Sequence, residues 1–171
     1  MILGLSTATY TLVHVVISLI GIGSGVVVLW GMLRAKTLEG ITAIFLGSTL
    51  LTSITGFFFP NQHITPGIVV GILSVIVLAF AIPAKYVFHL AGPWRLTYVI
   101  TSMLALYFNC FVFVVQAFEK SAPLHALAPT QKEPPFQITQ LVMLVAFIVL
   151  TVLAARRFHV EQAQPALRRA A

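Results

Sequence analysis

Five long apolar stretches dominate this sequence and leave few ways for the chain to fold. A helix needs about 20 apolar residues to cross a hydrocarbon core that is roughly 30 Å thick. Stretches of about that length cover residues 11–33, 41–59, 66–88, 94–118 and 136–155. None of them contains an aspartate or glutamate, and only 8% of all residues are charged. The sequence therefore predicts an all-α integral membrane protein, a bundle of five spanning helices.

Lysine and arginine are divided unevenly between the two sides of the predicted bundle. One side receives Arg34, Lys36, Lys85, Arg95, Arg156, Arg157, Arg168 and Arg169. The other side receives only Lys120 and Lys132. Because loops rich in lysine and arginine face the cytoplasm, we expect the N-terminus outside and the C-terminus in the cytoplasm. The chain then divides into a membrane domain over residues 1–158 and a basic cytoplasmic tail over residues 159–171.

The net charge of +6 does not indicate a nucleic-acid-binding protein. The basic residues stand singly or in pairs, without the basic stripe and interleaved aromatic residues that such proteins carry. The lipid bilayer is the partner that the composition predicts. A homo-oligomer or a larger membrane complex is compatible with the same composition.

Small residues at helical spacing predict where the helices pack. Helices in lipid associate through close packing of small residues and through hydrogen bonds between helices. Gly21 and Gly25 form a GxxxG pattern in the first stretch, and Gly67 and Gly71 form another in the third. We expect these glycines to line contacts within the bundle. The alternative is an oligomer interface that builds a transporter or channel for a small solute.

Polar side chains gather towards the outer ends of the predicted helices. An ionisable residue inside a span indicates function, and His14 lies about one turn into the first stretch. Candidate ligand-binding residues are His14, Asn109, Gln116, Gln137 and Gln140. The alternative for His14 is a neutral imidazole that is hydrogen-bonded to Gln116 or Gln140 on a neighbouring helix.

Three histidines, His14, His63 and His125, lie towards the same side. Imidazole is a ligand of zinc, copper and haem iron. The spacing of these residues matches no metal-binding signature, and two of the three lie in predicted loops, where histidines are usually solvated. A metal or haem site is therefore an alternative hypothesis, and the cofactor stays open.

The loop over residues 119–135 holds four prolines around an apolar middle. Proline restricts the conformations of a chain, so this loop is either an ordered cap over the outer helix ends or a stiff connector. Residues 128–136 (APTQKEPPF), 14–18 (HVVIS) and 55–60 (TGFFFP) resemble a family of small, uncharacterised bacterial inner-membrane proteins. The resemblance implies a bacterial inner membrane, and it brings no activity and no functional residues.

The sequence carries none of the common signatures of an enzyme. No predicted span carries a carboxylate, no Gly-rich phosphate loop is present, and no serine nucleophile with a base can be identified. These observations favour a non-catalytic accessory or ligand-binding subunit of the inner membrane, with a polar site at its outer, periplasmic end. The alternatives are an oligomeric transporter or channel, and a redox protein that binds haem or copper at the outer histidines.

Overall fold

The structure, a computed structural model, describes residues 2, 4–60 and 65–159. The helices are α1 (Thr7–Leu33), α2 (Glu39–Gly56), α3 (Pro66–Tyr86), α4 (Pro93–Lys120), the short α5 (Ala122–Leu127) and α6 (Pro134–Arg157). No strand is present in these residues, where the only β-type pairing is an isolated bridge between Ile2 and Leu5. The all-α prediction is confirmed.

Short polar side chains and prolines set where the helices begin. The Ser6 hydroxyl accepts a hydrogen bond from the Thr9 backbone at 3.1 Å and so caps α1. The Thr65 hydroxyl caps α3 in the same way. Proline opens α3, α4 and α6, where its missing N–H costs nothing because the first N–H groups of a helix have no partner within the helix.

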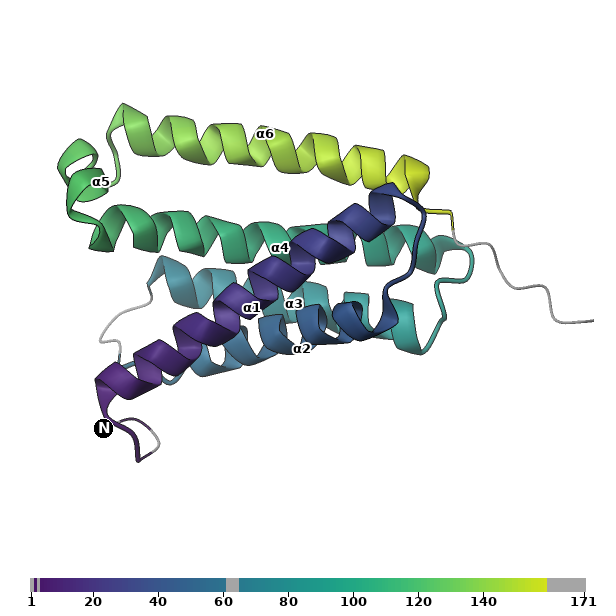
Figure 1. Cartoon of the computed structure of the whole chain (residues 1–171), viewed down its shortest axis with the longest axis horizontal. Helices are drawn as coiled ribbons and strands as arrows, with labels where there is room; N and C mark the ends of the chain where they lie inside the picture. The colour runs from purple at the N-terminus through teal and green to yellow at the C-terminus, as the bar shows by residue number, and fades with distance from the viewer. Residues whose placement is uncertain (1, 3, 61–64, 160–171) are drawn as a thin grey trace, which may run out of the picture.

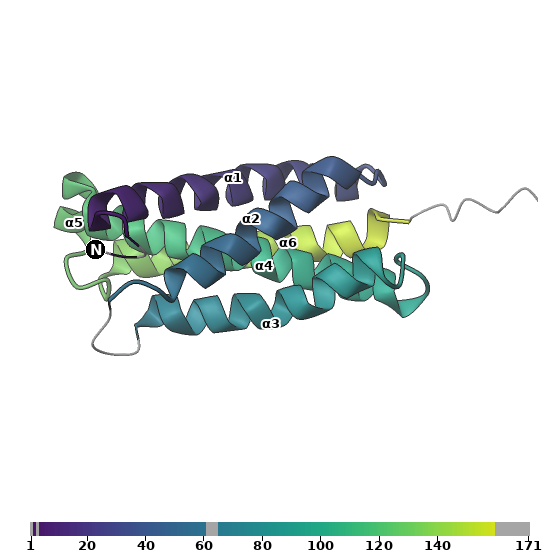
Figure 2. The ribbon, with the colours of Figure 1, turned by 90° about the horizontal axis from the view of Figure 1, so that it is seen from below.

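The long helices lie side by side and alternate in direction (Figures 1 and 2). We call one end of the bundle the His14 end; α1, α3 and α6 begin there, and α2 and α4 finish there. The opposite end is called the Lys85 end. Helix α4 lies at the centre, since it contacts α1, α2, α3, α5 and α6.

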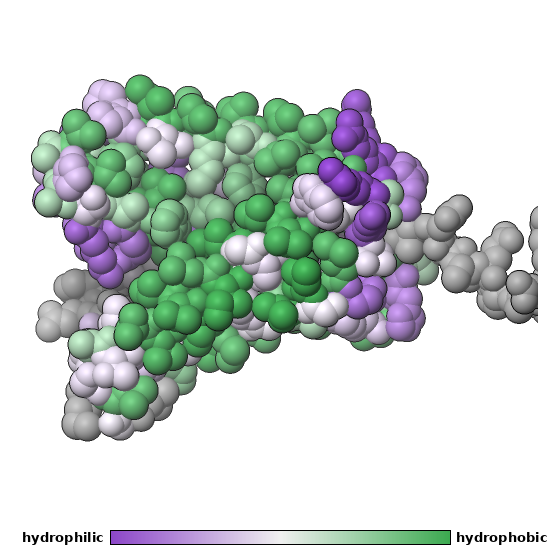
Figure 3. Space-filling model, viewed as in Figure 1, coloured by the Kyte–Doolittle hydropathy of each residue, from purple (hydrophilic) through white to green (hydrophobic). Residues whose placement is uncertain are grey.

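Within the described residues, four helices are long and apolar enough to cross a membrane: α1, α3, α4 and α6. Helix α2, the second of the five predicted spans, is not among these four. Hydrophobic side chains cover the middle of the face seen in Figure 3, and hydrophilic ones gather towards its two ends. In α6 the only buried residue is Ala154. Such exposed apolar surface is typical of a multi-pass membrane protein.

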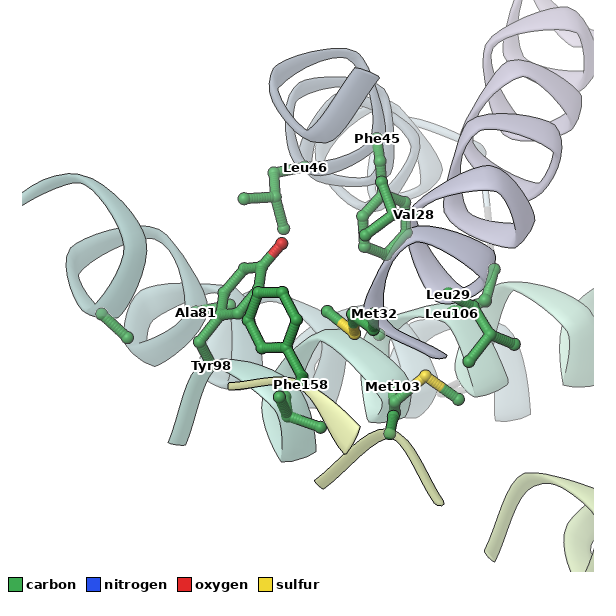
Figure 4. Packing of buried hydrophobic residues seen from close by; sticks show 14 of the residues in the cluster. Val28, Leu29, Met32, Phe45, Leu46, Ala81, Tyr98, Met103, Leu106 and Phe158 are labelled. Carbon is green, nitrogen blue, oxygen red and sulfur yellow. The ribbon is translucent and has the colours of Figure 1, made fainter. Parts of the chain in front are cut away.

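The hydrophobic core lies in the half of the bundle towards the Lys85 end. It is built from side chains within residues 28–32 of α1, 45–46 of α2, 78–84 of α3, 98–106 of α4 and 154–158 at the end of α6. Figure 4 shows these side chains packed together from different helices. The helices are therefore joined most firmly at this end.

Close helix contacts occur at two of the glycines in α1. A Cβ atom on Gly25 would lie 2.6 Å from Leu106 and 2.8 Å from Phe45, so only glycine fits there without movement. A Cβ atom on Gly21 would lie 3.3 Å from the Asn109 amide. Both positions bring α1 close to its neighbours, which is how small residues act in membrane helices.

The GxxxG pattern at the start of α3 behaves differently at its two glycines. A Cβ atom on Gly71 would lie 3.0 Å from the Phe57 ring, which follows α2. Around Gly67 the nearest described atom is the Thr65 hydroxyl of its own turn, at 3.7 Å. Gly67 is the second residue of α3, where the helix has not yet reached a neighbour within the described residues.

Candidate functional site

His14 is held in one orientation by a threonine of the neighbouring helix. Its ring nitrogen Nδ1 lies 2.8 Å from the Thr55 hydroxyl oxygen, and that hydroxyl donates to the Leu51 carbonyl at 2.7 Å. A hydroxyl has one hydrogen, so we assign Nδ1 as the donor to Thr55. In the neutral imidazole, Nε2 then carries the lone pair and is the nitrogen that can accept from a ligand.

Two aromatic residues complete the surroundings of His14. The Tyr10 hydroxyl donates to the Thr55 carbonyl oxygen at 2.8 Å. The Phe59 ring meets the Tyr10 and His14 rings edge to face, with centroids 5.2 Å apart in each case. Tyr10 and His14 are one helical turn apart on α1, so they share a face. We call Tyr10, His14, Thr55 and Phe59 the His14 site.

The alternative in which His14 is hydrogen-bonded to Gln116 or Gln140 is wrong, because its partner is Thr55 and both glutamines bond elsewhere. Gln116 Nε2 donates to Glu119 at 3.3 Å, within α4. Gln140 Nε2 donates to the Phe111 carbonyl at 3.4 Å and so joins α6 to α4. At this end α1 pairs with α2, which leaves both glutamines to the hairpin of α4 and α6.

The remaining two candidate ligand-binding residues, Asn109 and Gln137, also form hydrogen bonds within the protein. Asn109 is buried, and its amide nitrogen donates to the Thr49 hydroxyl at 3.0 Å, which links α4 to α2. Gln137 Nε2 donates to the Lys132 carbonyl at 2.8 Å, at the start of α6. None of the hydrogen bonds found in the described residues joins one of the five candidate residues to another.

The candidate metal ligands are not brought together in the part of the chain that the structure describes. His125 is exposed on α5. His63 lies outside the described residues. No group of three or more His, Cys, Asp or Glu side chains that could hold a metal ion occurs among residues 2, 4–60 and 65–159.

The proline-rich loop folds against α4 and α6. Ala128 is fully buried, the Gln131 amide donates to the Val115 carbonyl at 3.2 Å, and the Phe118 and Phe136 rings meet edge to face. In Figure 1, α5 lies beyond the adjacent ends of α4 and α6, well away from the start of α1. The loop thus closes this hairpin, and in the described residues it does not cover the His14 site.

The Lys85 end holds a polar pocket that the sequence interpretation missed. Lys85 is only 7% exposed, and its ammonium lies 2.5 Å from a Glu39 carboxylate oxygen. The pocket beside this pair has a volume of about 400 Å³ and is lined by Thr37, Glu39, Lys85, Tyr86, His89 and Leu90. The available signal was a carboxylate two residues before the second stretch and a lysine near the end of the third.

Arg95 also has a partner that the sequence did not reveal. Its guanidinium donates to the Ala155 and Phe158 carbonyls at 3.0 and 2.5 Å, where α6 ends. The last carbonyls of a helix have no partner within the helix, so Arg95 supplies two of the missing donors. It fixes the end of α6 against α4.

Comparisons with known proteins add no family to these observations. No protein-family model, no curated protein and no solved structure matches the chain.

Proposed function

We propose that the chain crosses the bilayer five times, with α2 as the additional span. An 18-residue helix is about 27 Å long, close to the roughly 30 Å of a hydrocarbon core. The hydroxyls of Ser48, Ser53 and Thr55 donate to backbone carbonyls one turn earlier, which lowers the cost of placing them in lipid. The neighbours α1, α3 and α4 also cover α2.

The charges favour the Lys85 end as the cytoplasmic end. Six described basic residues flank that end: Arg34, Lys36, Lys85, Arg95, Arg156 and Arg157. Lys120 and Lys132 flank the other. By the positive-inside rule the His14 end lies outside. In the bacterial inner membrane, which the resemblance of residues 128–136 implies, this is the periplasmic side.

Single cysteines test the number of spans and the orientation together. In a Cys110→Ala background, Thr37→Cys and Ser121→Cys are labelled in intact cells with a maleimide that cannot cross membranes. Five spans put the two residues on opposite sides, so only Ser121→Cys reacts. If α2 does not cross, both residues lie on one side and react alike, and the proposal is wrong.

The function that the geometry supports best is non-catalytic binding of a small ligand at the His14 site, as an accessory or ligand-binding subunit. The observation that carries it is the oriented imidazole, whose Nε2 lone pair can accept an O–H or N–H group of a ligand. The partly exposed Phe59 ring, which packs edge to face on His14, offers apolar surface to the rest of such a molecule. Thr55 is a neutral partner that orients the imidazole without placing a second charge beside it, which suits the binding of a neutral ligand.

Native mass spectrometry of gently extracted protein tests this function. We expect the wild type to retain a small molecule of defined mass, and His14→Ala to lose it. Thr55→Val retains less of it, because the imidazole is no longer held in one orientation. His125→Ala, which changes an exposed histidine of α5, is the matched control and binds like the wild type.

The identity of the retained mass decides between the hypotheses. A neutral or apolar organic molecule supports the proposal, and the mass and absorbance of haem or copper support the redox alternative. A bare chain in wild type and variants alike, with all of them folded, contradicts ligand binding at His14. Equal retention by the wild type and a folded His14→Ala variant contradicts it too.

A further inference from the structure

The pocket at the Lys85 end combines a buried cation with the start of a helix. Its volume of about 400 Å³ falls in the range of roughly 300–1,000 Å³ that is usual for small-molecule sites. The turn between α1 and α2 forms one side of it, through Thr37 and Glu39. The end of α3 and the following turn form the other, through Lys85, Tyr86, His89 and Leu90.

Lys85 has more hydrogen-bond donors than the described residues use. An ammonium group carries three N–H donors, and the only acceptor found for Lys85 in the described residues is one Glu39 oxygen. Lys85 is buried and is one of the residues that line the pocket. Two of its donors are therefore available to a molecule in the pocket.

The N-terminus of α2 adds further donors on the same side. Leu38 stands at the capping position, and no side chain there accepts from the first N–H groups of the helix. Uncapped N–H groups and the positive end of the helix dipole favour an anion. The Thr37 and Tyr86 hydroxyls and the His89 imidazole line the same space and can donate to oxygen atoms.

Among the described residues, Glu39 is the one carboxylate that lines the pocket, and its side chain is largely exposed to solvent. Its side chain is 65% exposed, whereas that of Lys85 is only 6% exposed. Arg34 and Lys36 precede Thr37 in the turn between α1 and α2 and add positive charge at this end of the bundle. A stronger anion can replace Glu39 beside Lys85, because the carboxylate can turn into solvent while the ammonium stays.

We propose that this pocket binds a phosphate-bearing anion through the Lys85 ammonium and the start of α2, with Glu39 as the group that the anion displaces. Phosphate offers several acceptor oxygens to these converging donors, and charge-assisted bonds of this kind are the stronger ones. The phosphate comes either from a lipid headgroup at the membrane surface or from a soluble anion. This site is separate from the His14 site and does not depend on it.

Substitutions of the two ion-pair partners are predicted to change anion binding in opposite directions. Lys85→Met keeps the length of the side chain and removes its charge, so anion binding falls about tenfold or more. Glu39→Gln removes the competing charge, so binding becomes several-fold tighter. If the pair only holds α2 to α3, Glu39→Gln does not tighten binding. Lys132→Met, at an exposed lysine of the other end, is the matched control and has no effect.

Trp94 provides the readout, because its ring stacks on Phe88 with centroids 3.8 Å apart, next to the turn that carries His89. A Trp30→Phe background leaves Trp94 as the only tryptophan. The full chain is placed in phosphatidylcholine nanodiscs at constant ionic strength. One arm adds inorganic phosphate, and the other replaces part of the lipid with phosphatidic acid. Thermal unfolding of each variant verifies that it is folded.

Each outcome decides a different point. A saturable fluorescence change with inorganic phosphate identifies a soluble anion, and a change only with phosphatidic acid identifies a lipid headgroup. A change in neither arm overturns the proposal, as does an equal response in wild type and a folded Lys85→Met variant. If Lys85→Met does not fold, Glu39→Gln decides, and unchanged or weaker binding in that variant overturns the proposal.

Discussion

Replacing Gly25 with alanine puts a methyl group into a contact between α1, α2 and α4 that leaves no room for it. The new Cβ atom would lie 2.6 Å from Leu106 Cδ1 and 2.8 Å from Phe45 Cε2. Carbon atoms in contact are normally about 3.5–4.0 Å apart, so the overlap is about 1 Å. Leu106 and Phe45 are each 1% exposed, so any movement has to pass through the core. Overpacking of this kind costs about 1–3 kcal/mol.

Gly23→Ala is the matched control on the same helix. A Cβ atom on Gly23 meets no described atom within 4 Å. Both substitutions remove the conformational freedom of a helical glycine, which stabilises a helix by up to about 1 kcal/mol. We therefore expect Gly23→Ala to be neutral or slightly stabilising, and Gly25→Ala to be less stable than Gly23→Ala by about 1–3 kcal/mol. Reversible unfolding by sodium dodecyl sulfate in mixed micelles, followed by circular dichroism, measures both.

A second substitution shows whether the clash is the cause. Leu106→Ala removes the atom nearest to the new methyl group. The double variant Gly25→Ala/Leu106→Ala should lose less stability than the sum of the single variants, by at least about 0.5 kcal/mol. Equal effects of Gly23→Ala and Gly25→Ala, or full additivity in the double variant, would refute the reasoning.

Three further predictions concern single contacts. A double-mutant cycle of Asn109→Leu and Thr49→Val should give a coupling energy of about 0.6 kcal/mol, and at most about 1.7, in the same unfolding assay. Arg95→Met should speed amide hydrogen exchange in the last turn of α6, because the bonds to its carbonyls are lost. Slight desolvation raises the pKa of Glu133, but hydrogen bonds from Thr130 and from backbone N–H groups outweigh it and hold this pKa below 4.5. The stability from ionised Glu133 is therefore complete above pH 4.5 and is lost as the pH falls through the lowered pKa, which a pH titration of the loop by nuclear magnetic resonance measures.

Each of these predictions has a result that contradicts it. A coupling energy of zero would mean that Asn109 and Thr49 are neighbours without a useful bond. Unchanged exchange in Arg95→Met would mean that water or lipid headgroups satisfy the end of α6 equally well. A Glu133 carboxylate that titrates at or above 4.5 would mean that the bonds from Thr130 do not favour the ionised form.

The positions of the helices could be predicted from the sequence because their ends carry local signals. The first stretch was expected from residue 11, whereas α1 begins at Thr7. The difference arises because Ser6 caps the helix and the polar residues after it are still helical. Pro66, Pro93 and Pro134 mark the starts of three other helices within two residues of their expected positions.

The partners of His14 and Lys85 could not be predicted, because they depend on how the helices are rotated. A helix that is apolar all round carries little information about which face meets a neighbour. Thr55 is 41 residues from His14 and Glu39 is 46 residues from Lys85, so no local pattern joins them. The glutamines were reasonable partners for His14 by depth, but they lie on helices that pack elsewhere.

The central place of α4 also sets the order in which the protein can be assembled. Synthesis delivers α1, α2 and α3 before α4, and the Asn109 amide follows the Thr49 hydroxyl by 60 residues. At translation rates of about 5–20 residues per second, this gap lasts about 3–12 s. Until then the Thr49 hydroxyl has no amide to meet, and α1, α2 and α3 contact one another without the helix that packs against all three of them. A chain that stops before α4 therefore leaves the buried polar face of α2 without its amide partner.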